Sequence, residues 1–271
     1  MKYLLAMVTA ALALPEPGGA QSLRVTYLAN MGVQLSAGGT TVVIDALHRG
    51  RLPGYTALLP DAQRAIEEGR PPLERIAVAL VTHRHLDHFD ADAALARLAR
   101  DTALVLVGPT EVIDTLVARQ PSLRRDPRLR GVRGGERLQV NGVSIHVLDL
   151  PHNPTRTPLA QNVGYVIELA GHRVLHTGDA DPRGETFLTR GVRAMAIHTA
   201  VVPVWYVTAD NGALLEAIGA SCFLASHVAP GDTAEVGRRV VAARAGARAL
   251  ATRGLTWQLE ATGRGGCTDT R

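Results

Sequence analysis

The chain has 271 residues and a formal net charge of +4. The roughly 250 residues that follow a predicted leader suffice for one large domain with a buried core. Lys2 is the only lysine, which excludes a lysine nucleophile or Schiff base from the mature protein. The two cysteines, Cys222 and Cys267, are too few for a disulfide framework, although an oxidising compartment would permit one bridge between them.

The first residues have the three parts of a secretory signal peptide. Lys2 supplies a positive charge, residues 3–14 form a short apolar core, and small residues at 18–20 end the segment. The apolar core is shorter than the about 20 residues that span a bilayer; a buried N-terminal strand or helix is the alternative. We expect cleavage after Ala20 and a protein that is secreted, or periplasmic in a Gram-negative bacterium, without a membrane anchor.

The mature chain alternates short strands with helices. Strands are predicted at residues 24–29, 33–37, 41–45, 76–81, 102–107, 137–140, 143–150, 163–169, 173–177, 194–202, 222–226 and 255–260, and helices at 58–68, 91–100, 111–119, 209–218 and 233–245. This rhythm fits two sheets packed face to face with helices outside. We therefore expect residues 21–271 to form one domain, in which 124–133 is a loop and the last ten residues fray.

The densest chemistry lies in residues 81–90, Val-Thr-His-Arg-His-Leu-Asp-His-Phe-Asp. His83, His85, Asp87 and His88 lie on the turn between a predicted buried strand and a helix that Asp90 caps. Side chains on such a turn can converge on one point, and neutral imidazole and carboxylate are usual ligands of zinc and similar divalent ions. A solvated polar turn, which is the alternative, does not need three histidines.

The pattern His83-Xaa-His85-Xaa-Asp87-His88 resembles the signature of the metallo-β-lactamase superfamily. That family completes its site with residues at later strand ends, and the chain has three candidates in the same order, each after a predicted strand: His152, Asp179 and His227. The resemblance covers nearly the whole mature chain. It implies an α/β fold of the αββα sandwich type, with two mixed β-sheets packed face to face and helices outside.

The resemblance also implies how these seven side chains divide. One metal ion would be held by His83, His85 and His152, a second by Asp87, His88 and His227, and both would be bridged by Asp179. The expected cofactors are two divalent ions, zinc first, with manganese or iron as alternatives. Two ions about 3.5–4 Å apart can share a hydroxide nucleophile and polarise the scissile bond. Asp87 would orient that hydroxide and carry a proton toward the leaving group.

These features predict a secreted dinuclear-metal-dependent hydrolase that cleaves a small ester, lactone, thioester or phosphodiester. A β-lactam hydrolase is one alternative; export favours it, but the secreted β-lactamases of the superfamily lack the carboxylate at the Asp179 position. An iron-dependent oxidoreductase of the same fold is another, because the same ligands hold iron. A catalytically silent metal-binding module is the third. The expected partner is a small-molecule substrate and not nucleic acid, since basic residues 124–133 lack interleaved aromatic side chains.

Further residues are candidates for contacts around the metal ions. His48 follows the strand predicted at 41–45 and is expected to contact substrate, while Asp45 and His176 are candidates for hydrogen bonds to the ligands. Trp205 and its neighbour Tyr206 fit the core or the rim of the cleft. Residues 49–55 are placed where a lid could form.

Three further histidines are expected to have no part in the site. His146 and His198 lie in predicted strands and fit structural positions, and His172 lies in the turn at Gly171, where we expect it to be exposed.

Overall fold

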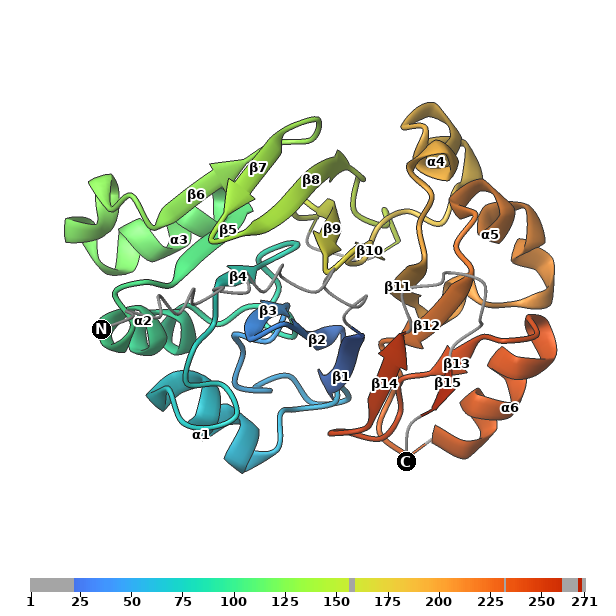
Figure 1. Cartoon of the computed structure of the whole chain (residues 1–271), viewed down its shortest axis with the longest axis horizontal. Helices are drawn as coiled ribbons and strands as arrows, with labels where there is room; N and C mark the ends of the chain where they lie inside the picture. The colour runs from blue at the N-terminus through green and yellow to red at the C-terminus, as the bar shows by residue number, and fades with distance from the viewer. Residues whose placement is uncertain (1–21, 156–158, 232, 260–267, 270–271) are drawn as a thin grey trace, which may run out of the picture.

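The structure, a computed structural model, describes residues 22–155, 159–231, 233–259 and 268–269. The predicted signal peptide at residues 1–20 and Cys267 lie outside this part of the chain. Within it, two β-sheets face each other and helices cover their outer faces (Figure 1). This arrangement confirms the predicted αββα sandwich.

The first sheet joins an antiparallel half to a parallel half. Its order is β15 (Thr268–Asp269), β14 (Thr256–Leu259), β1 (Leu23–Ala29), β2 (Gly32–Ala37), β3 (Thr40–Ile44), β4 (Val78–Leu80), β5 (Val105–Pro109) and β6 (Leu129–Val132). Strands from β15 to β3 pair antiparallel, and strands from β3 to β6 pair parallel. Because β3, β4 and β5 run in one direction, the segments that follow them emerge at the same edge of the sheet.

The second sheet repeats this mixed arrangement. Its order is β13 (Arg248–Ala249), β12 (Cys222–Ser226), β11 (Thr199–Pro203), β10 (His172–His176), β9 (Val163–Leu169), β8 (Val143–Asp149) and β7 (Arg137–Val140). Strands β7 to β10 pair antiparallel, and β10 to β13 pair parallel. The ends of β8, β10, β11 and β12 therefore share one edge, since two antiparallel steps restore the direction of β8.

The main core lies between the sheets. In β1 the side chains of Leu23, Val25 and Tyr27 are buried, whereas the side chain of Arg24 is exposed. This alternation follows from the two-residue period of a strand, which sends neighbouring side chains to opposite faces. Ile145 and Val147 of β8 belong to the same buried cluster. Burying a side chain of this size contributes about 1.5–3 kcal/mol, so the two inner faces hold the sandwich together.

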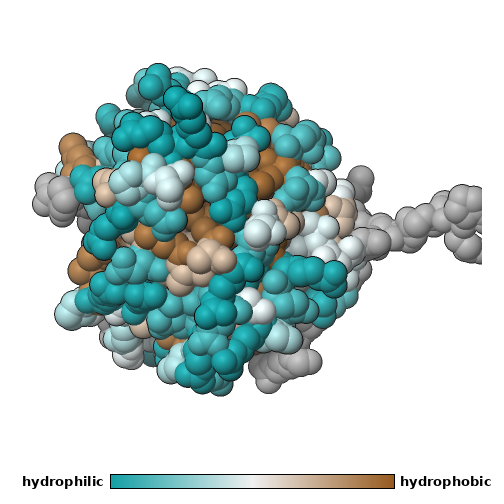
Figure 2. All heavy atoms as spheres, turned by 90° about the vertical axis from the view of Figure 1, so that its left-hand side faces the viewer, coloured by the Kyte–Doolittle hydropathy of each residue, from teal (hydrophilic) through white to brown (hydrophobic). Residues whose placement is uncertain are grey.

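Helices cover the outer faces through separate clusters of buried side chains. On the first sheet lie α1 (Pro60–Glu68), α2 (Ala91–Arg100) and α3 (Thr110–Arg119). On the second lie α4 (Gly184–Thr189), α5 (Gly212–Ile218) and α6 (Thr233–Ala243). The left-hand face of Figure 1, viewed directly in Figure 2, is mostly hydrophilic with smaller hydrophobic areas near its middle. Among the described residues, none of the helices has the length and apolar character to cross a membrane.

Short 3₁₀ helices lie between the other elements: η1 (Pro121–Arg125), η2 (Val192–Met195), η3 (Val204–Tyr206) and η4 (Ala209–Asn211). Several predicted boundaries need correction because of them. The strand predicted at 194–202 is η2 followed by β11, and the helix predicted at 209–218 is η4 followed by α5. The predicted cap of α2 is confirmed, since the Asp90 side chain accepts hydrogen bonds from the backbone N–H groups of Asp92 and Ala93.

Two predictions about irregular segments were wrong. Residues 124–133 were expected to be a loop, but they contain β6, an edge strand in which only Val132 is buried and which lacks the alternating hydrophobic pattern. The last ten residues were expected to fray; this is wrong for Thr268 and Asp269, which form β15 and pair with β14, while the other eight lie outside the described residues. Cys222, at the start of β12, is disulfide-bonded and buried.

Candidate metal centre

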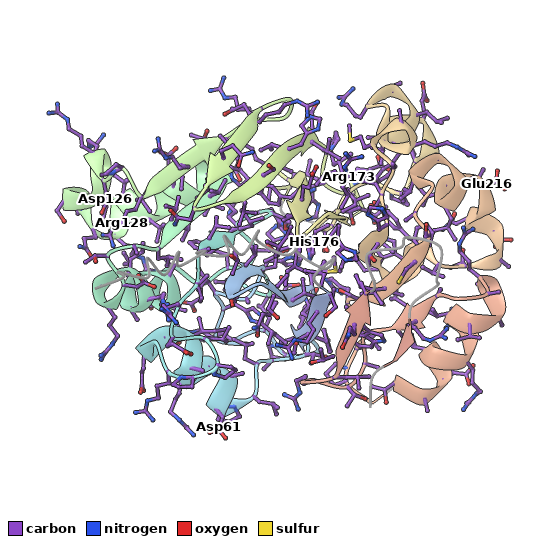
Figure 3. The ribbon with its side chains drawn as sticks, in the orientation of Figure 1. Asp61, Asp126, Arg128, Arg173, His176 and Glu216 are labelled. Carbon is purple, nitrogen blue, oxygen red and sulfur yellow. The ribbon has the colours of Figure 1, made fainter. Side chains whose placement is uncertain are left out.

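The candidate site lies where the ends of both sheets meet. His83 follows β4, His152 follows β8, Asp179 follows β10, and His227 follows β12. The β1–β2 turn, with Asn30, reaches the same edge because β2 begins where the neighbouring β3 ends. Figure 3 labels His176, the last residue of β10, near the middle of the molecule. All seven residues proposed as ligands are carried by segments of this one edge.

The first group consists of His83, His85 and His152. One ring nitrogen from each lies within 4.8 Å of the others, and Nε2 of His83 is 3.1 Å from Nδ1 of His85. The His83 side chain is completely buried and that of His152 almost so. Three imidazoles at this spacing offer three nitrogen ligands and leave a fourth, tetrahedral position open, as in catalytic zinc sites.

The second group adds the carboxylates. Asp87, His88 and His227 place ligand atoms within 4.8 Å of one another, and so do His83, His88 and Asp179. Oδ2 of Asp87 is 3.4 Å from Nε2 of His88 and 3.3 Å from Nε2 of His227. Asp179 lies across from it, with Oδ1 3.5 Å from His88 Nε2 and Oδ2 3.3 Å from His227 Nε2. Asp179 thus lies close both to His83 of the first group and to the histidines of the second group.

Hydrogen bonds to the outer nitrogens aim three of these imidazoles at the centre. The Thr82 hydroxyl donates to Asp45 Oδ2 (2.6 Å) and so accepts from Nδ1 of His83 (3.0 Å). Nδ1 of His88 donates to the same Asp45 oxygen at 2.8 Å, and Nδ1 of His152 donates to the Asn153 carbonyl at 3.0 Å. With the proton on Nδ1, the lone pair on Nε2 is free for a metal ion.

The buried atoms that remain unpaired fit a bound cation. Within the described part of the chain, Nε2 of His88, His152 and His227 and Oδ1 of Asp179 are buried without any hydrogen-bond partner. A buried polar atom without a partner costs about 1–3 kcal/mol, and four in one place demand an explanation. Nitrogen and carboxylate oxygen are the donors that zinc, manganese and iron accept, so these residues suit a divalent cation.

The electrostatics agree with a cation site. Burial raises the pKa of the Asp179 carboxyl, but the neighbouring His227 and His88 outweigh burial and hold it well below its usual range. The Asp87 carboxyl behaves the same way beside His88 and His227, and its pKa is also far below its usual range. Burial lowers the pKa of His83 and of His152, which keeps them neutral. Burial also disfavours the charge on His88 and His227, but the carboxylates of Asp87 and Asp179 outweigh burial and raise the pKa of both imidazoles. Without an ion the centre therefore pairs ionised carboxylates with imidazoles that bind protons, and a bound cation would displace those protons.

Asn30 lies in the centre, although no sequence pattern indicated a place for it there. Its side-chain amide donates to Oδ2 of Asp87 at 2.9 Å, and its backbone carbonyl accepts from the backbone N–H of His227 at 3.1 Å. One buried turn residue thereby orients Asp87 and fixes the chain at His227. An Asn between two predicted strands gives no such signal in the sequence, because turns commonly contain asparagine.

Three residues of this region have strained backbones. Asn30, Asp45 and His227 have φ angles of 48°, 49° and 63°, in the left-handed region that residues with side chains seldom adopt. Such conformations cost about 1–3 kcal/mol each and concentrate at functional sites. The sharp turns they make allow Asp45 and His227 to point back into the centre directly after strands β3 and β12.

Gly178 is required by the close approach of two segments. Its φ is +56°, and a Cβ at this position would overlap Oδ1 of Asn162 and lie 2.7 Å from Cβ of Thr82. The Asn162 side chain in turn donates to the carbonyls of Leu150 (2.8 Å) and Thr177 (3.1 Å) and accepts from the Asp179 N–H (3.2 Å). Asn162 and Gly178 thus position Asp179 against the strand end that carries His83.

The other histidines have varied surroundings. His48 is 1 % exposed, with Nδ1 accepting from the Gly50 N–H at 3.3 Å, so its contact with substrate stays a prediction. His176 was a candidate for a hydrogen bond to a metal ligand. Its Nε2 instead donates to the Met31 carbonyl at 2.9 Å and so supports the β1–β2 turn. His172 was expected to be exposed, but it is the first residue of β10 and is buried, with its ring 5.8 Å from that of His198.

Comparisons with known proteins agree with this architecture. A model of the β-lactamase superfamily domain matches residues 40–248. A UPF0173 metal-dependent hydrolase from Roseiflexus sp. is 29 % identical over 154 residues, which are 54 % of this chain and 56 % of that protein. The chain therefore spans little more than half the length of that relative.

Two solved structures share the fold at low identity. Igni18, a metallo hydrolase from Ignicoccus hospitalis, has a TM-score of 0.62 and 17 % identity over 88 % of this chain and 99 % of that one. An isothiocyanate hydrolase from Delia radicum gut bacteria has a TM-score of 0.63 and 16 % identity, again over 88 % and 99 %. With the domain match covering most of the sequence, the chain belongs to the metallo-β-lactamase superfamily.

Proposed function

We propose that the protein is a hydrolase that uses two divalent metal ions to cleave a small ester, lactone, thioester or phosphodiester. The observation that carries this proposal is the convergence of seven buried or half-buried ligand atoms, four of them unpaired, at one edge of the sandwich. The name of the Roseiflexus relative, a metal-dependent hydrolase, supports it over the matched half. Bound ions would supply a water nucleophile of lowered pKa and polarise the scissile bond.

The chain's own residues divide the remaining work. Asp87 Oδ2 is held by the Asn30 amide at 2.9 Å, which leaves the other oxygen to accept a proton from the attacking water. Asp179 balances the positive charge that the site attracts. Asp45 accepts a hydrogen bond from Nδ1 of His88 and orients the His83 ring through the Thr82 hydroxyl. Keeping these groups oriented before substrate arrives is worth several kcal/mol of transition-state stabilisation.

The presence of Asp179 favours this function over β-lactam hydrolysis. Asp179 is 4 % exposed and faces both histidines of the second group, which supports the bridging role that the resemblance implies and that the secreted β-lactamases are expected to lack. A nitrocefin assay on metal-loaded protein separates the two functions. Metal analysis of the natively purified protein separates zinc from iron, and a protein that holds only zinc would exclude the iron-dependent oxidoreductase.

The substitution Asp87→Asn tests the proposed chemistry. Asparagine keeps the size and one oxygen ligand but loses the charge and the proton acceptor, so kcat should fall at least about 10²-fold while KM changes little. The assay needs saturating metal, because weaker binding at the second position is also expected. A variant that retains near wild-type kcat at saturating metal would refute the role assigned to Asp87.

We also propose that the protein is exported. Residues 1–20 carry the pattern of a signal peptide, and the disulfide at Cys222 suits an oxidising compartment. Mass spectrometry of protein from the periplasm or medium should give a chain that begins after Ala20. Full-length protein confined to the cytosol would argue against export.

A further inference from the structure

A pocket of about 390 Å³ adjoins His227. Its walls come mainly from three segments that are far apart in the sequence: the loop after β3, the η3 turn after β11, and the chain from β12 into α6. Besides His227, the lining includes Asn30, Tyr55, Val204, Trp205, Val228 and Val236. Since His227 is itself part of the wall, a molecule in this pocket lies next to the candidate metal centre.

Two aromatic rings enclose His227 on the pocket side. The ring of Tyr55 lies 5.3 Å from the His227 ring at an interplanar angle of 76°, and that of Trp205 lies 4.9 Å away at 67°. Both are edge-to-face arrangements, which are favourable between aromatic rings. The two rings therefore form an apolar wall whose innermost point is a proposed metal ligand.

The loop that carries Tyr55 is fixed in place without a ligand. The Thr56 hydroxyl donates to the Val228 carbonyl at 3.0 Å, across the pocket wall. Arg253 donates to the Ala57 carbonyl at 2.8 Å, and Arg49 forms two 2.8 Å hydrogen bonds with Glu67 of α1. A pocket held open in this way loses little conformational entropy when a ligand binds.

The chemistry of the wall discriminates between substrate classes. The described residues that line it include no aspartate, glutamate, lysine or arginine. A charged substrate group placed in this pocket would lack the arginine or lysine with which proteins usually meet a phosphate or carboxylate. By contrast, the pocket beside His152 includes Arg133, Asp149, Gln161 and Asn162. The apolar part of a substrate therefore belongs on the His227 side.

We propose that the pocket beside His227 binds the apolar acyl or alkyl group of a neutral carboxylic ester, lactone or thioester, and that Tyr55 and Trp205 set the preference for its length. This inference rests on the proposed hydrolase function, because it names the substrate class of the same site. Each methylene transferred from water into an apolar pocket strengthens binding roughly fourfold. Affinity should rise at that rate along a homologous series until the pocket is full.

Binding to metal-free protein tests the pocket independently of catalysis. After treatment with a chelator, the protein is titrated in a calorimeter with ethyl acetate, ethyl butyrate, ethyl hexanoate and ethyl octanoate. We expect Kd to fall roughly fourfold per methylene. Tyr55→Ala and Trp205→Ala should each weaken octanoate ester binding at least about fivefold and leave acetate ester binding unchanged. Tyr55 lies on a loop, so its variant remains informative if Trp205→Ala fails to fold.

A matched control removes an apolar side chain elsewhere. Leu188 on α4 is 62 % exposed and contributes nothing to the lining of this pocket; Leu188→Ala should bind the whole ester series like the wild type. Ethyl octyl phosphate, which has an apolar chain of similar length and one negative charge, should bind more weakly than ethyl octanoate. Equal or tighter binding of the phosphate would overturn the inference.

Hydrolysis by zinc-loaded protein separates the inference from the proposed function. The inference stands if kcat/KM rises with acyl length and the Tyr55 and Trp205 variants flatten that rise. It also stands if metal-free protein binds esters with the expected length dependence but zinc-loaded protein cleaves none; in that case the hydrolase proposal fails for carboxylic esters. If esters are cleaved at rates independent of acyl length and bind without length dependence, the hydrolase proposal survives and the inference is wrong.

Discussion

Oδ2 of Asp45 lies 2.8 Å from Nδ1 of His88, and both side chains are completely excluded from solvent. On its other side the His88 ring presents Nε2 to Asp87 and Asp179. A carboxylate behind a metal-binding imidazole fixes the tautomer and the direction of the ring and raises its basicity. Asp45 also accepts from the backbone N–H of Thr82 at 2.7 Å, so one carboxylate connects β3 to the strand end that carries His83.

We predict that Asp45→Asn weakens metal binding about 10–100-fold. Asparagine tolerates the left-handed backbone at this position, where φ is 49°, so the fold should survive while the His88 ring loses its charged acceptor. Zinc affinity is measured by competition with a chelator. The control is Asp210→Asn, which changes an exposed carboxylate in η4 and should leave affinity unchanged. Wild-type affinity in Asp45→Asn would show that the Asp45–His88 contact does not tune the ligand.

Asn30→Gly isolates the hydrogen bond to Asp87. Glycine adopts the left-handed backbone without strain and keeps the Asn30 carbonyl, which accepts from His227; only the side-chain amide is lost. A hydrogen bond to a charged group contributes about 1.5–3 kcal/mol, so we expect kcat/KM for a substrate that the wild type cleaves to fall roughly tenfold or more.

The matched control for that variant is Asn141→Gly. Asn141 has nearly the same φ, 46°, but lies in the exposed turn between β7 and β8, where its amide donates to the carbonyls of Ala77 and Ala103. Both variants should lose similar stability, as measured by the melting temperature, while only Asn30→Gly loses activity. Equal loss of activity in the two would count against a positioning role for Asn30.

The sequence is most informative where chemistry is concentrated locally. His83, His85, Asp87 and His88 lie in one six-residue segment, and β-strand ends with a following His or Asp mark the other proposed ligands; the fold follows from the same order of strands and helices. Tyr55 and Trp205 give no comparable signal, since neither flanks a ligand in sequence. Both rings contact His227 because the loop after β3 and the turn after β11 pack against it in the folded protein. Such long-range packing is invisible to periodicity.

Gly178→Ala should be strongly destabilising. The new methyl group would overlap Asn162 and crowd Thr82, and φ is +56°. Left-handed backbone costs alanine about 1–2 kcal/mol, and overpacking adds about 1–3 kcal/mol. The control Gly171→Ala has φ of +78° and nothing within 4 Å of the added Cβ, so it should show the backbone cost alone. Urea unfolding of both variants gives the difference; equal losses would show that the Asn162 contact relaxes freely.

His48 should make the protein less stable in mild acid. Burial, followed by the nearby His88, lowers its pKa from 6.5 to about 4, although Asp87, Asp45 and Asp90 act in the opposite direction. Between these two pKa values the unfolded chain binds a proton that the folded chain excludes. Stability from this residue is therefore full above about pH 6.5 and declines as the pH falls toward 4, by up to about 1.4 kcal/mol per pH unit.

The variant His48→Asn tests this effect. Asparagine can still accept from the Gly50 N–H, the 3.3 Å contact that Nδ1 of His48 makes, but it does not titrate. Unfolding free energies of the metal-free proteins are measured in urea from pH 7 to pH 4.5, because metal release would otherwise add its own pH dependence. Other buried histidines titrate equally in both proteins, so the difference between the two curves reports His48. That difference should shift steadily in favour of the variant as the pH falls. Parallel curves would mean that His48 is protonated in the folded protein, and that the burial of its ring does not exclude the charge.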